Sequence, residues 1–298
     1  MPNRTTRPLI TLIGGPTASG KSRLALRLAE EGDAVIVNAD SQQLYADLQI
    51  LTARPSGEDE ARAEHRLYGV ADGADPWSVG RWVRAVTPLL AELTAEGRAA
   101  VLVGGTGLYF NALVRGLADI PPPPVEVLAA VRTFYDEAGE SAVRRRLGEV
   151  DPHSARAIAP GDRQRLVRAL AVAEATGRPL SDWRAETRPI LAAGTYEALV
   201  IEPDRQSLYA ACDARVGTMI ETGALDEVRR LMTRDLDPNL PIMKAVGVPQ
   251  LAQALTGTIT LADAAAAMRQ ATRNYAKRQL TWFRNQTPEW IRTTFPEP

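Results

Sequence analysis

One glycine-rich stretch is placed where a protein could bind an anionic substrate. Residues 15–22 read GPTASGKS and fit the pattern G-x-x-x-x-G-K-[ST] between a predicted strand and a predicted helix. In such a loop the backbone N–H groups, the helix N-terminus and the lysine attract phosphate oxygens. A glycine-rich turn without a ligand fits less well, because the full pattern stands in its expected context. We expect a diphosphate or polyphosphate ligand, with the Ser22 hydroxyl on Mg²⁺, held by Gly15, Thr17, Ala18, Ser19, Gly20, Lys21 and Ser22.

Asp40 follows a second predicted strand and could transfer a proton. Ligands of open parallel sheets bind beyond the carboxyl ends of the strands, and the usual topology predicts that Asp40 lies next to the strand of the phosphate loop. A carboxylate there could accept a proton from an incoming nucleophile. Two other roles stay open: a ligand of Mg²⁺ or water, and an N-cap for a helix beginning near Ser41.

A third predicted strand ends in the sequence GGTG at residues 104–107. Glycines let the backbone approach a ligand closely, and the turn presents the Thr106 hydroxyl. Alone this is a moderate signal for a binding site, and it gains weight from the two strand ends described above.

Short apolar runs alternate with helical patterns, which indicates an α/β core with a parallel sheet and helices on both faces. The expected strands are 9–13, 34–37, 99–103, 196–201 and 290–295, and the expected helices are 22–30, 78–96, 206–234 and 260–285. A four-proline connector at 121–124 precedes an arginine-rich stretch, 125–187, that is helical throughout. We predict a core of residues 1–118 and 194–298, interrupted by an all-helical insert at 119–193.

Composition excludes several classes of protein. The net charge of −1 over 298 residues predicts that any nucleic-acid site is a local patch. One cysteine, Cys212, allows no internal disulfide and reads as a core residue, and His65 and His153 lack the spacing of a zinc site. The first eleven residues lack the apolar segment of a secretory signal, and no apolar run reaches the ~20 residues of a membrane span. We expect a cytoplasmic protein with no membrane contact, monomeric by default and with no obligate protein partner evident.

Seven stretches together resemble the tRNA dimethylallyltransferase, or tRNA isopentenyltransferase, family over nearly the whole chain. They are GPTASGKS at 15–22, NADSQQLY at 38–45, TARP at 52–55, LVGGTGLYF at 102–110, DRQRLVRAL at 162–170, RVGTMIETGALDEV at 215–228 and RNYAKRQLTWFR at 273–284. The resemblance implies a P-loop NTPase-like core that binds dimethylallyl diphosphate as its working substrate. It implies transfer of the prenyl group to the exocyclic amine of the adenosine immediately 3′ of a tRNA anticodon.

The resemblance also assigns roles to particular residues. Asp40 matches the general base, and Thr106 matches a residue that helps place the adenosine. Arg215 joins Lys21 and Ser22 with Mg²⁺ in holding the leaving diphosphate. The insert is expected to grip the anticodon stem-loop. The residues expected to contact tRNA are Asp40, Ser41, Gln42, Gln43, Gln164, Arg165, Leu166, Val167, Arg168, Lys244, Lys277, Arg278, Gln279 and Arg284.

Two clusters of basic residues are candidate RNA-binding patches, and the resemblance favours this interpretation. Arg269, Arg273 and Lys277 recur every four residues, so they share one helix face, and no acid interrupts 269–284. Arg163, Arg165 and Arg168 cluster in the insert, and such patches suit a phosphate backbone. The alternative is a solvated helix face, and Trp282 and Phe283 read as core residues more readily than as stacking platforms.

The chain departs from the family at two places. Leu128 stands where the family often has an arginine, so one RNA contact is missing or is supplied by Arg132. Pro249 is unusual beside the loosely matching segment 243–248, which it would rigidify. Three other functions share part of the pattern: a small-molecule or nucleotide kinase, an adenylate isopentenyltransferase, and a nucleotide-switched RNA-binding protein.

Overall fold

The computed structural model describes residues 9–294, and the chain divides into two compact units. One unit comprises Met1–Val114 and Leu191–Pro298, and the other comprises Arg115–Ile190, whereas the insert was expected at 119–193. No described helix is both long and apolar enough to cross a membrane. The expectation about a secretory signal concerns residues 1–11, of which 1–8 lie outside the described residues.

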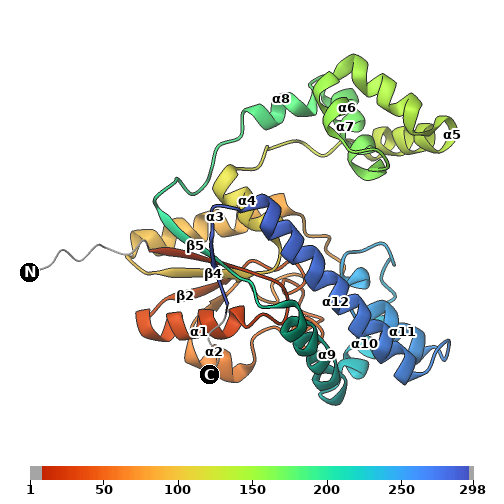
Figure 1. The fold of residues 1–298 in the computed structure, drawn as a ribbon. Helices are drawn as coiled ribbons and strands as arrows, with labels where there is room; N and C mark the ends of the chain where they lie inside the picture. Colours follow the sequence, from red (N-terminus) through yellow and green to blue (C-terminus); the bar gives the residue numbers. More distant parts are fainter. Residues whose placement is uncertain (1–8, 295–298) are drawn as a thin grey trace, which may run out of the picture. The chain divides into compact units, whose positions relative to one another are not determined.

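The first unit is built on a six-stranded sheet in which every pair of neighbours is parallel (Figure 1). The strand order is β3-β2-β4-β1-β5-β6. This confirms the predicted α/β class with a parallel sheet. The strands are β1 (Ile10–Gly14), β2 (Val35–Asn38), β3 (His65–Arg66), β4 (Ala100–Gly104), β5 (Tyr196–Ile201) and β6 (Ile291–Thr293).

Two details of the predicted sheet were wrong. Asp40 was expected next to the strand of the phosphate loop, but β4 lies between β1 and β2. The last strand is shorter than the expected 290–295, and Phe295 lies outside the described residues. β3 was not predicted because two residues are too few to show a periodic pattern.

The register brings three strand ends to one edge of the sheet. Gly14 pairs with Gly104, and Asn38 pairs with Val103. The segments that follow β1, β2 and β4 therefore leave the sheet side by side. These segments are the phosphate loop, the turn containing Asp40 and the GGTG turn.

Helices cover both faces of this sheet, with α1 on one face and α3 and α4 on the other (Figure 1). Ser78 caps α3 as expected, because its side chain accepts a hydrogen bond from the Arg81 N–H. The predicted single helix 206–234 is wrong, because Gly223, at φ 109°, separates α9 from α10. The helices are α1 (Lys21–Gly32), α2 (Gly57–Arg62), α3 (Val79–Ala95), α4 (Gly107–Arg115), α9 (Arg205–Glu221), α10 (Ala224–Met232), the 3₁₀ helix η1 (Ile242–Lys244), α11 (Val248–Leu255) and α12 (Leu261–Gln286).

The second unit is helical, as its sequence pattern predicts. It contains α5 (Val125–Val150), α6 (Pro152–Ala157), α7 (Arg163–Thr176) and α8 (Leu180–Ala185), and α5 kinks at Gly139. Val143, Leu147, Leu166 and Leu170 form the centre of a separate hydrophobic core. This unit therefore has a buried core of its own.

Candidate active site

The phosphate loop borders a cavity of about 380 Å³ at the shared edge of the strands. Every residue from Thr17 to Ser22 lines it, which brings together all the predicted diphosphate ligands except the buried Gly15. Ser19 is 5% exposed, and its hydroxyl has no hydrogen-bond partner in the described structure. Arg23 follows Ser22 along α1, and the remaining lining residues come from three other segments: Asp40 and Gln43, Thr52 and Ala53, and Arg215.

Two cations reach this cavity from different helices. Lys21, the first residue of α1, donates a hydrogen bond from Nζ to the Pro16 carbonyl at 3.0 Å. Burial lowers the pKa of Lys21 to about 8, and the nearby negative charge of Asp40 opposes this effect. Arg215, from α9, donates to the Thr17 hydroxyl at 3.1 Å, and burial lowers its pKa as well. Because Arg215 follows the loop by almost two hundred residues, only the fold joins them.

Asp40 lies in a tight turn after β2 and is 9% exposed. Its Oδ1 accepts the Gln42 N–H at 3.0 Å, and its Oδ2 accepts the Gly105 N–H at 3.3 Å. No helix begins near Ser41 in the described structure, so the helix-capping alternative is wrong and Asp40 caps a turn instead. Asn38 supports this turn, since its side chain bonds both the N–H and the carbonyl of Asp40.

Thr106 fastens the GGTG turn to the turn containing Asp40. Its hydroxyl oxygen accepts the Ser41 N–H at 2.9 Å and donates to the Ser41 hydroxyl at 3.1 Å. Gly107 follows, and a side chain at this position would collide with the indole ring of Trp282. The turn is therefore held on one side by Ser41 and on the other by α12.

Gln279 lies inside the site and not on the basic surface expected from the sequence. It is 5% exposed, accepts the Thr17 N–H at 2.8 Å and donates to the Gly105 carbonyl at 3.1 Å. One buried amide therefore bridges the phosphate loop and the GGTG turn. Its predicted contact with tRNA would require an atom that these two bonds do not use.

A small pocket of about 40 Å³ with both polar and apolar lining residues adjoins the phosphate cavity. The two share Thr17, Asp40, Thr52 and Arg215. Burial raises the pKa of Tyr275, which also lines this pocket, so its phenol stays protonated. The side chains that complete the pocket are Gln42, Leu51, Met219, Val246, Met268 and Thr272.

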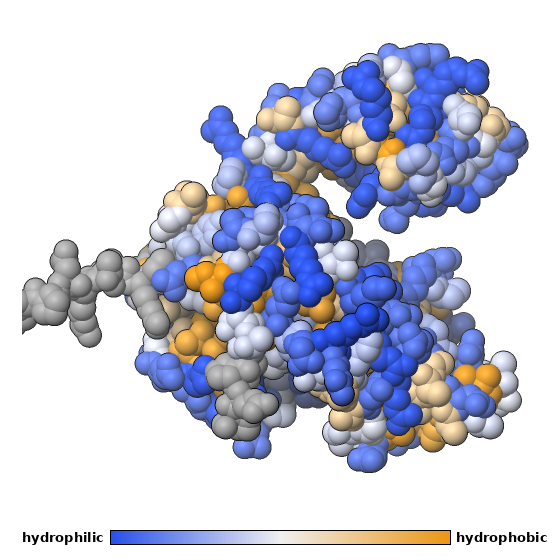
Figure 2. Space-filling model, viewed as in Figure 1, coloured by the Kyte–Doolittle hydropathy of each residue, from blue (hydrophilic) through white to orange (hydrophobic). Residues whose placement is uncertain are grey.

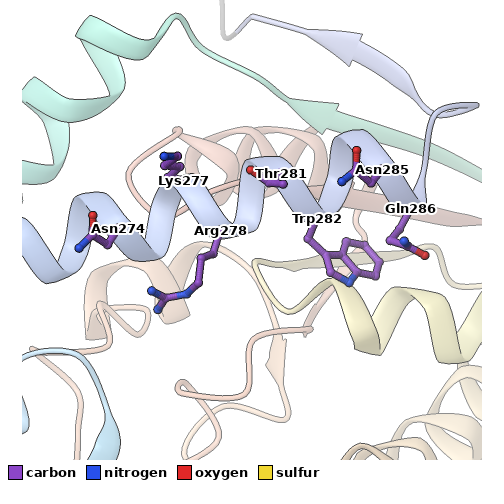
Figure 3. Close-up of a pocket in the computed structure, with 7 residues that line it drawn as sticks. All are labelled: Asn274, Lys277, Arg278, Thr281, Trp282, Asn285 and Gln286. Atoms are coloured by element: carbon purple, nitrogen blue, oxygen red, sulfur yellow. The ribbon is translucent and has the colours of Figure 1, made fainter. Parts of the chain in front are cut away.

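A groove of about 530 Å³ runs along the outer side of α12 (Figure 3). Lys277 and Thr281 point to one side of the helix, and Arg278 and Trp282 point to the other. The surface over α12 is largely hydrophilic (Figure 2). Phe283 is fully buried, as expected, whereas Trp282 is only partly buried and lines the groove.

Not every basic residue of α12 is available to a ligand. Arg273 binds Asp213 at 2.6 Å, and Arg284 binds Glu202 at 2.6 Å. Lys277 and Arg278 are exposed and form no ion pair within residues 9–294. Lys244, in η1, is exposed too. Pro249, which stood out in the sequence, lies in the first turn of α11, where proline fits without strain.

The helical unit has a groove of its own, of about 810 Å³. The exposed Gln164 and Arg165 line it, but the side chain of Leu166 is completely buried and that of Val167 is 4% exposed. These last two were predicted to contact tRNA, and both belong to the hydrophobic core of this unit, although Val167 also lines the groove. The other lining residues are Leu128, Arg132, Asp162, Arg163, Arg168, Leu180 and Arg184.

The sequence pattern did not predict several residues that line the site. Tyr275 and Met268 lie on α12, where aromatic and apolar residues at helical spacing indicate only core packing. Thr52 lies in the matching stretch 52–55 but was given no role. Arg132 and Leu128 both line the groove of the helical unit.

Fold and cavity define a phosphate-loop α/β protein in which a carboxylate faces the phosphate site. Comparison with known proteins narrows this class. A family model described as IPP transferase matches residues 43–286, and one described as Isopentenyl transferase matches residues 8–74. The tRNA dimethylallyltransferase of Phenylobacterium zucineum is 55% identical, over 96% of this chain and 93% of its own.

Two solved structures are similar. The full-length tRNA isopentenylpyrophosphate transferase of Bacillus halodurans is 31% identical with a TM-score of 0.66, and the match covers 96% of this chain and 90% of that one. A eukaryotic dimethylallyltransferase acting on tRNA shares the fold, with a TM-score of 0.80 at 24% identity, over 92% of this chain and 69% of that one. The chain belongs to the tRNA dimethylallyltransferase family, a family of prenyltransferases.

Proposed function

We propose that this enzyme transfers a dimethylallyl group from dimethylallyl diphosphate to the exocyclic amine of the adenosine immediately 3′ of the anticodon in tRNA, and releases diphosphate. One observation carries the proposal. Asp40 lines the phosphate cavity together with Lys21 and Arg215, and it is bonded to the turn that presents Thr106. A donor and an acceptor can therefore meet at one carboxylate.

In this reaction the C–O bond between the prenyl carbon and diphosphate breaks, and a C–N bond to the adenine amine forms. The amine is a weak nucleophile because its lone pair is delocalised into the ring. Asp40 would accept the proton that the amine loses, as a positioned general base. Thr106 already donates its proton to Ser41, so its free lone pair is what remains to orient the acceptor.

The leaving diphosphate would lie against the phosphate loop. Lys21 and Arg215 stabilise the negative charge that develops on the bridging oxygen. The prenyl chain would lie against Leu51, Met219 and Met268 of the small pocket next to the cavity, because these side chains offer no polar group to it. A donor bound this way would direct its reactive carbon toward Asp40, which both spaces share.

Mg²⁺ fits this arrangement as a partner of the ligand. No cluster of three or more His, Cys, Asp or Glu side chains among the described residues could hold a metal ion. Ser22 has an exposed hydroxyl in the phosphate cavity, and Mg²⁺ is commonly bound by few protein groups and completed by phosphate oxygens and water. Ser22 would hold the ion, which would supply charge neutralisation for the diphosphate.

The tRNA would contact exposed cations on each unit. In the core these are Lys244, Lys277 and Arg278, and the turn 41–43 stands beside the acceptor site. In the helical unit the groove with Arg132, Arg165 and Arg168 suits the anticodon stem-loop. The target adenine must leave its stack to reach Asp40. Enzymes that act on bases commonly offset this free energy of unstacking. We assign the enzyme to the cytoplasm, where its tRNA substrate resides.

The test is incubation of the protein with dimethylallyl diphosphate, Mg²⁺ and unmodified tRNA in ATP-free buffer, followed by mass analysis of nucleosides. We expect one prenylated adenosine per tRNA substrate and release of diphosphate. A parallel reaction with free adenosine monophosphate separates tRNA transfer from nucleotide transfer. An absolute requirement for ATP, or phosphoryl transfer to a metabolite, would refute the proposal in favour of a kinase.

A further inference from the structure

A buried carboxylate that lines neither cavity holds a turn at the proposed donor site. Glu227, in the first turn of α10, is 3% exposed. Its Oε1 accepts the N–H groups of Gln49 and Ile50 at 2.6 and 2.9 Å, and its Oε2 accepts the N–H of Leu51 at 2.9 Å. Three consecutive backbone amides therefore converge on one side chain that lies more than 170 residues away in sequence.

The amides belong to a short turn, residues 48–53, that reaches the cavities. The Ala53 N–H bonds to the Ile50 carbonyl, and the Thr52 hydroxyl bonds to the Leu48 carbonyl. Leu51 lines the small pocket, and Thr52 lines both this pocket and the phosphate cavity. A shift of this turn would move the wall that faces the phosphate loop.

Other contacts also fix this turn. The side-chain amide of Gln43 donates to the carbonyls of Thr52 and Ala53, both at 2.8 Å. A side chain at Gly247, which has φ 101°, would come within 2.6 Å of the Leu51 side chain and within 3.0 Å of Met268. The absence of a side chain at Gly247 thus leaves room for the Leu51 side chain, while Glu227 fixes the backbone of Leu51. Arg234, just beyond α10, adds an ion pair to Asp47 at the start of the same segment.

We propose that Glu227 is a positioning residue for the donor. Its carboxylate sets the turn 48–53 so that Leu51 and Thr52 complete the space for the prenyl chain and diphosphate. This inference rests on the proposed function. A carboxylate is needed because only it offers acceptors to three N–H groups without presenting a donor of its own.

Glu227→Gln tests the inference, because the amide NH₂ that replaces one oxygen points at a backbone N–H. A buried N–H without an acceptor costs enough to shift the turn, and we expect the KM for dimethylallyl diphosphate to rise by about tenfold or more. The Kd for tRNA and the salt dependence of tRNA binding should stay at the wild-type values. Glu227→Asp keeps the charge but has a shorter side chain, so its KM for the donor should lie between those of the wild type and Glu227→Gln.

Asp151→Asn is the matched control. Asp151 is fully buried and accepts two backbone N–H groups, from Ser154 and Ser181, within the helical unit. It should lose stability as Glu227→Gln does and keep the wild-type KM for the donor. If Glu227→Gln lowers only the free energy of unfolding and leaves the donor KM within the range of the control, Glu227 is merely structural and the inference is wrong.

Failure of the proposed function is distinguishable from failure of the inference. Calorimetric titration with inorganic diphosphate reports on the donor site without any transfer. Weaker diphosphate binding in Glu227→Gln than in Asp151→Asn supports the positioning role even for a protein that prenylates no tRNA. Equal diphosphate affinities in the two variants would overturn it. If Glu227→Gln does not fold, Glu227→Asp takes its place in both measurements.

Discussion

The most informative substitution is Asp40→Asn, because the structure separates the catalytic role of Asp40 from its structural one. Both carboxylate oxygens accept a backbone N–H, from Gln42 and from Gly105. Asparagine has one acceptor oxygen, so one of the two N–H groups loses its partner, at a cost to stability of about 1–3 kcal/mol if the group stays buried. Loss of a general base should slow the chemical step by about 10² to 10⁴. These two effects appear in different measurements.

The assay is single-turnover transfer with donor and tRNA both saturating, at pH 7. Donor binding is measured separately, because the negative charge of Asp40 helps to keep Lys21 protonated. Asp151→Asn again supplies a matched control, since it removes an acceptor from a buried two-oxygen cap without touching the site. We expect the control to lose stability and to retain the wild-type rate.

Either of two outcomes would refute the reasoning about Asp40. If Asp40→Asn transfers prenyl groups at nearly the wild-type single-turnover rate, Asp40 is not the base. If added Mg²⁺ restores the rate and donor binding is weak without it, Asp40 acts as a metal ligand. The control variant measures what the loss of one buried N–H partner costs in stability.

Three further predictions follow from the charges and the pocket. Lys21, with a pKa of about 8, is protonated below that pH and neutral above it, so affinity for dimethylallyl diphosphate should fall as pH rises through 8. Titrations of the wild type and of Lys21→Ala with this donor should therefore differ below pH 8. Both proteins should bind tRNA. Lys277→Ala should lower the slope of log tRNA affinity against log salt by about 0.7 to 0.9. Replacing both members of the Arg273–Asp213 ion pair by alanine leaves the net charge the same, so the slope should not change. Met268→Ala should enlarge the small pocket and raise the kcat/KM for geranyl diphosphate relative to dimethylallyl diphosphate by about tenfold or more. An unchanged ratio would place the prenyl chain elsewhere.

The sequence predicts those parts of the site whose structure depends on neighbouring residues in the chain. A strand followed by a glycine-rich turn shows its type within about ten residues, so the phosphate loop, Asp40 and the GGTG turn were all found at strand ends. The order of the strands depends on pairing between distant segments. For that reason the placement of β4 between β1 and β2 was missed, although this placement is what sets Thr106 beside Ser41.

Buried polar side chains were the hardest to predict. Glu227 and Gln279 lie in helices whose patterns mark charged and amide residues as exposed, yet they are 3% and 5% exposed. Each is buried because it satisfies backbone groups of a remote loop, and such a partner leaves no periodic signal near the side chain. Amphipathic pattern reading is therefore weakest where a polar group positions a site.

The basic run on α12 shows why a count of charges misjudges a nucleic-acid surface. From the sequence, Arg269, Arg273, Lys277, Arg278 and Arg284 read as one patch. The structure divides them, because Asp213 already neutralises Arg273 and Glu202 neutralises Arg284. Among these five, Lys277 and Arg278 are exposed and can release counterions from an RNA phosphate without first breaking an ion pair within residues 9–294. Since α12 also carries Gln279 on its buried side, the turn of helix that offers these two free cations is the one that joins the phosphate loop to the GGTG turn.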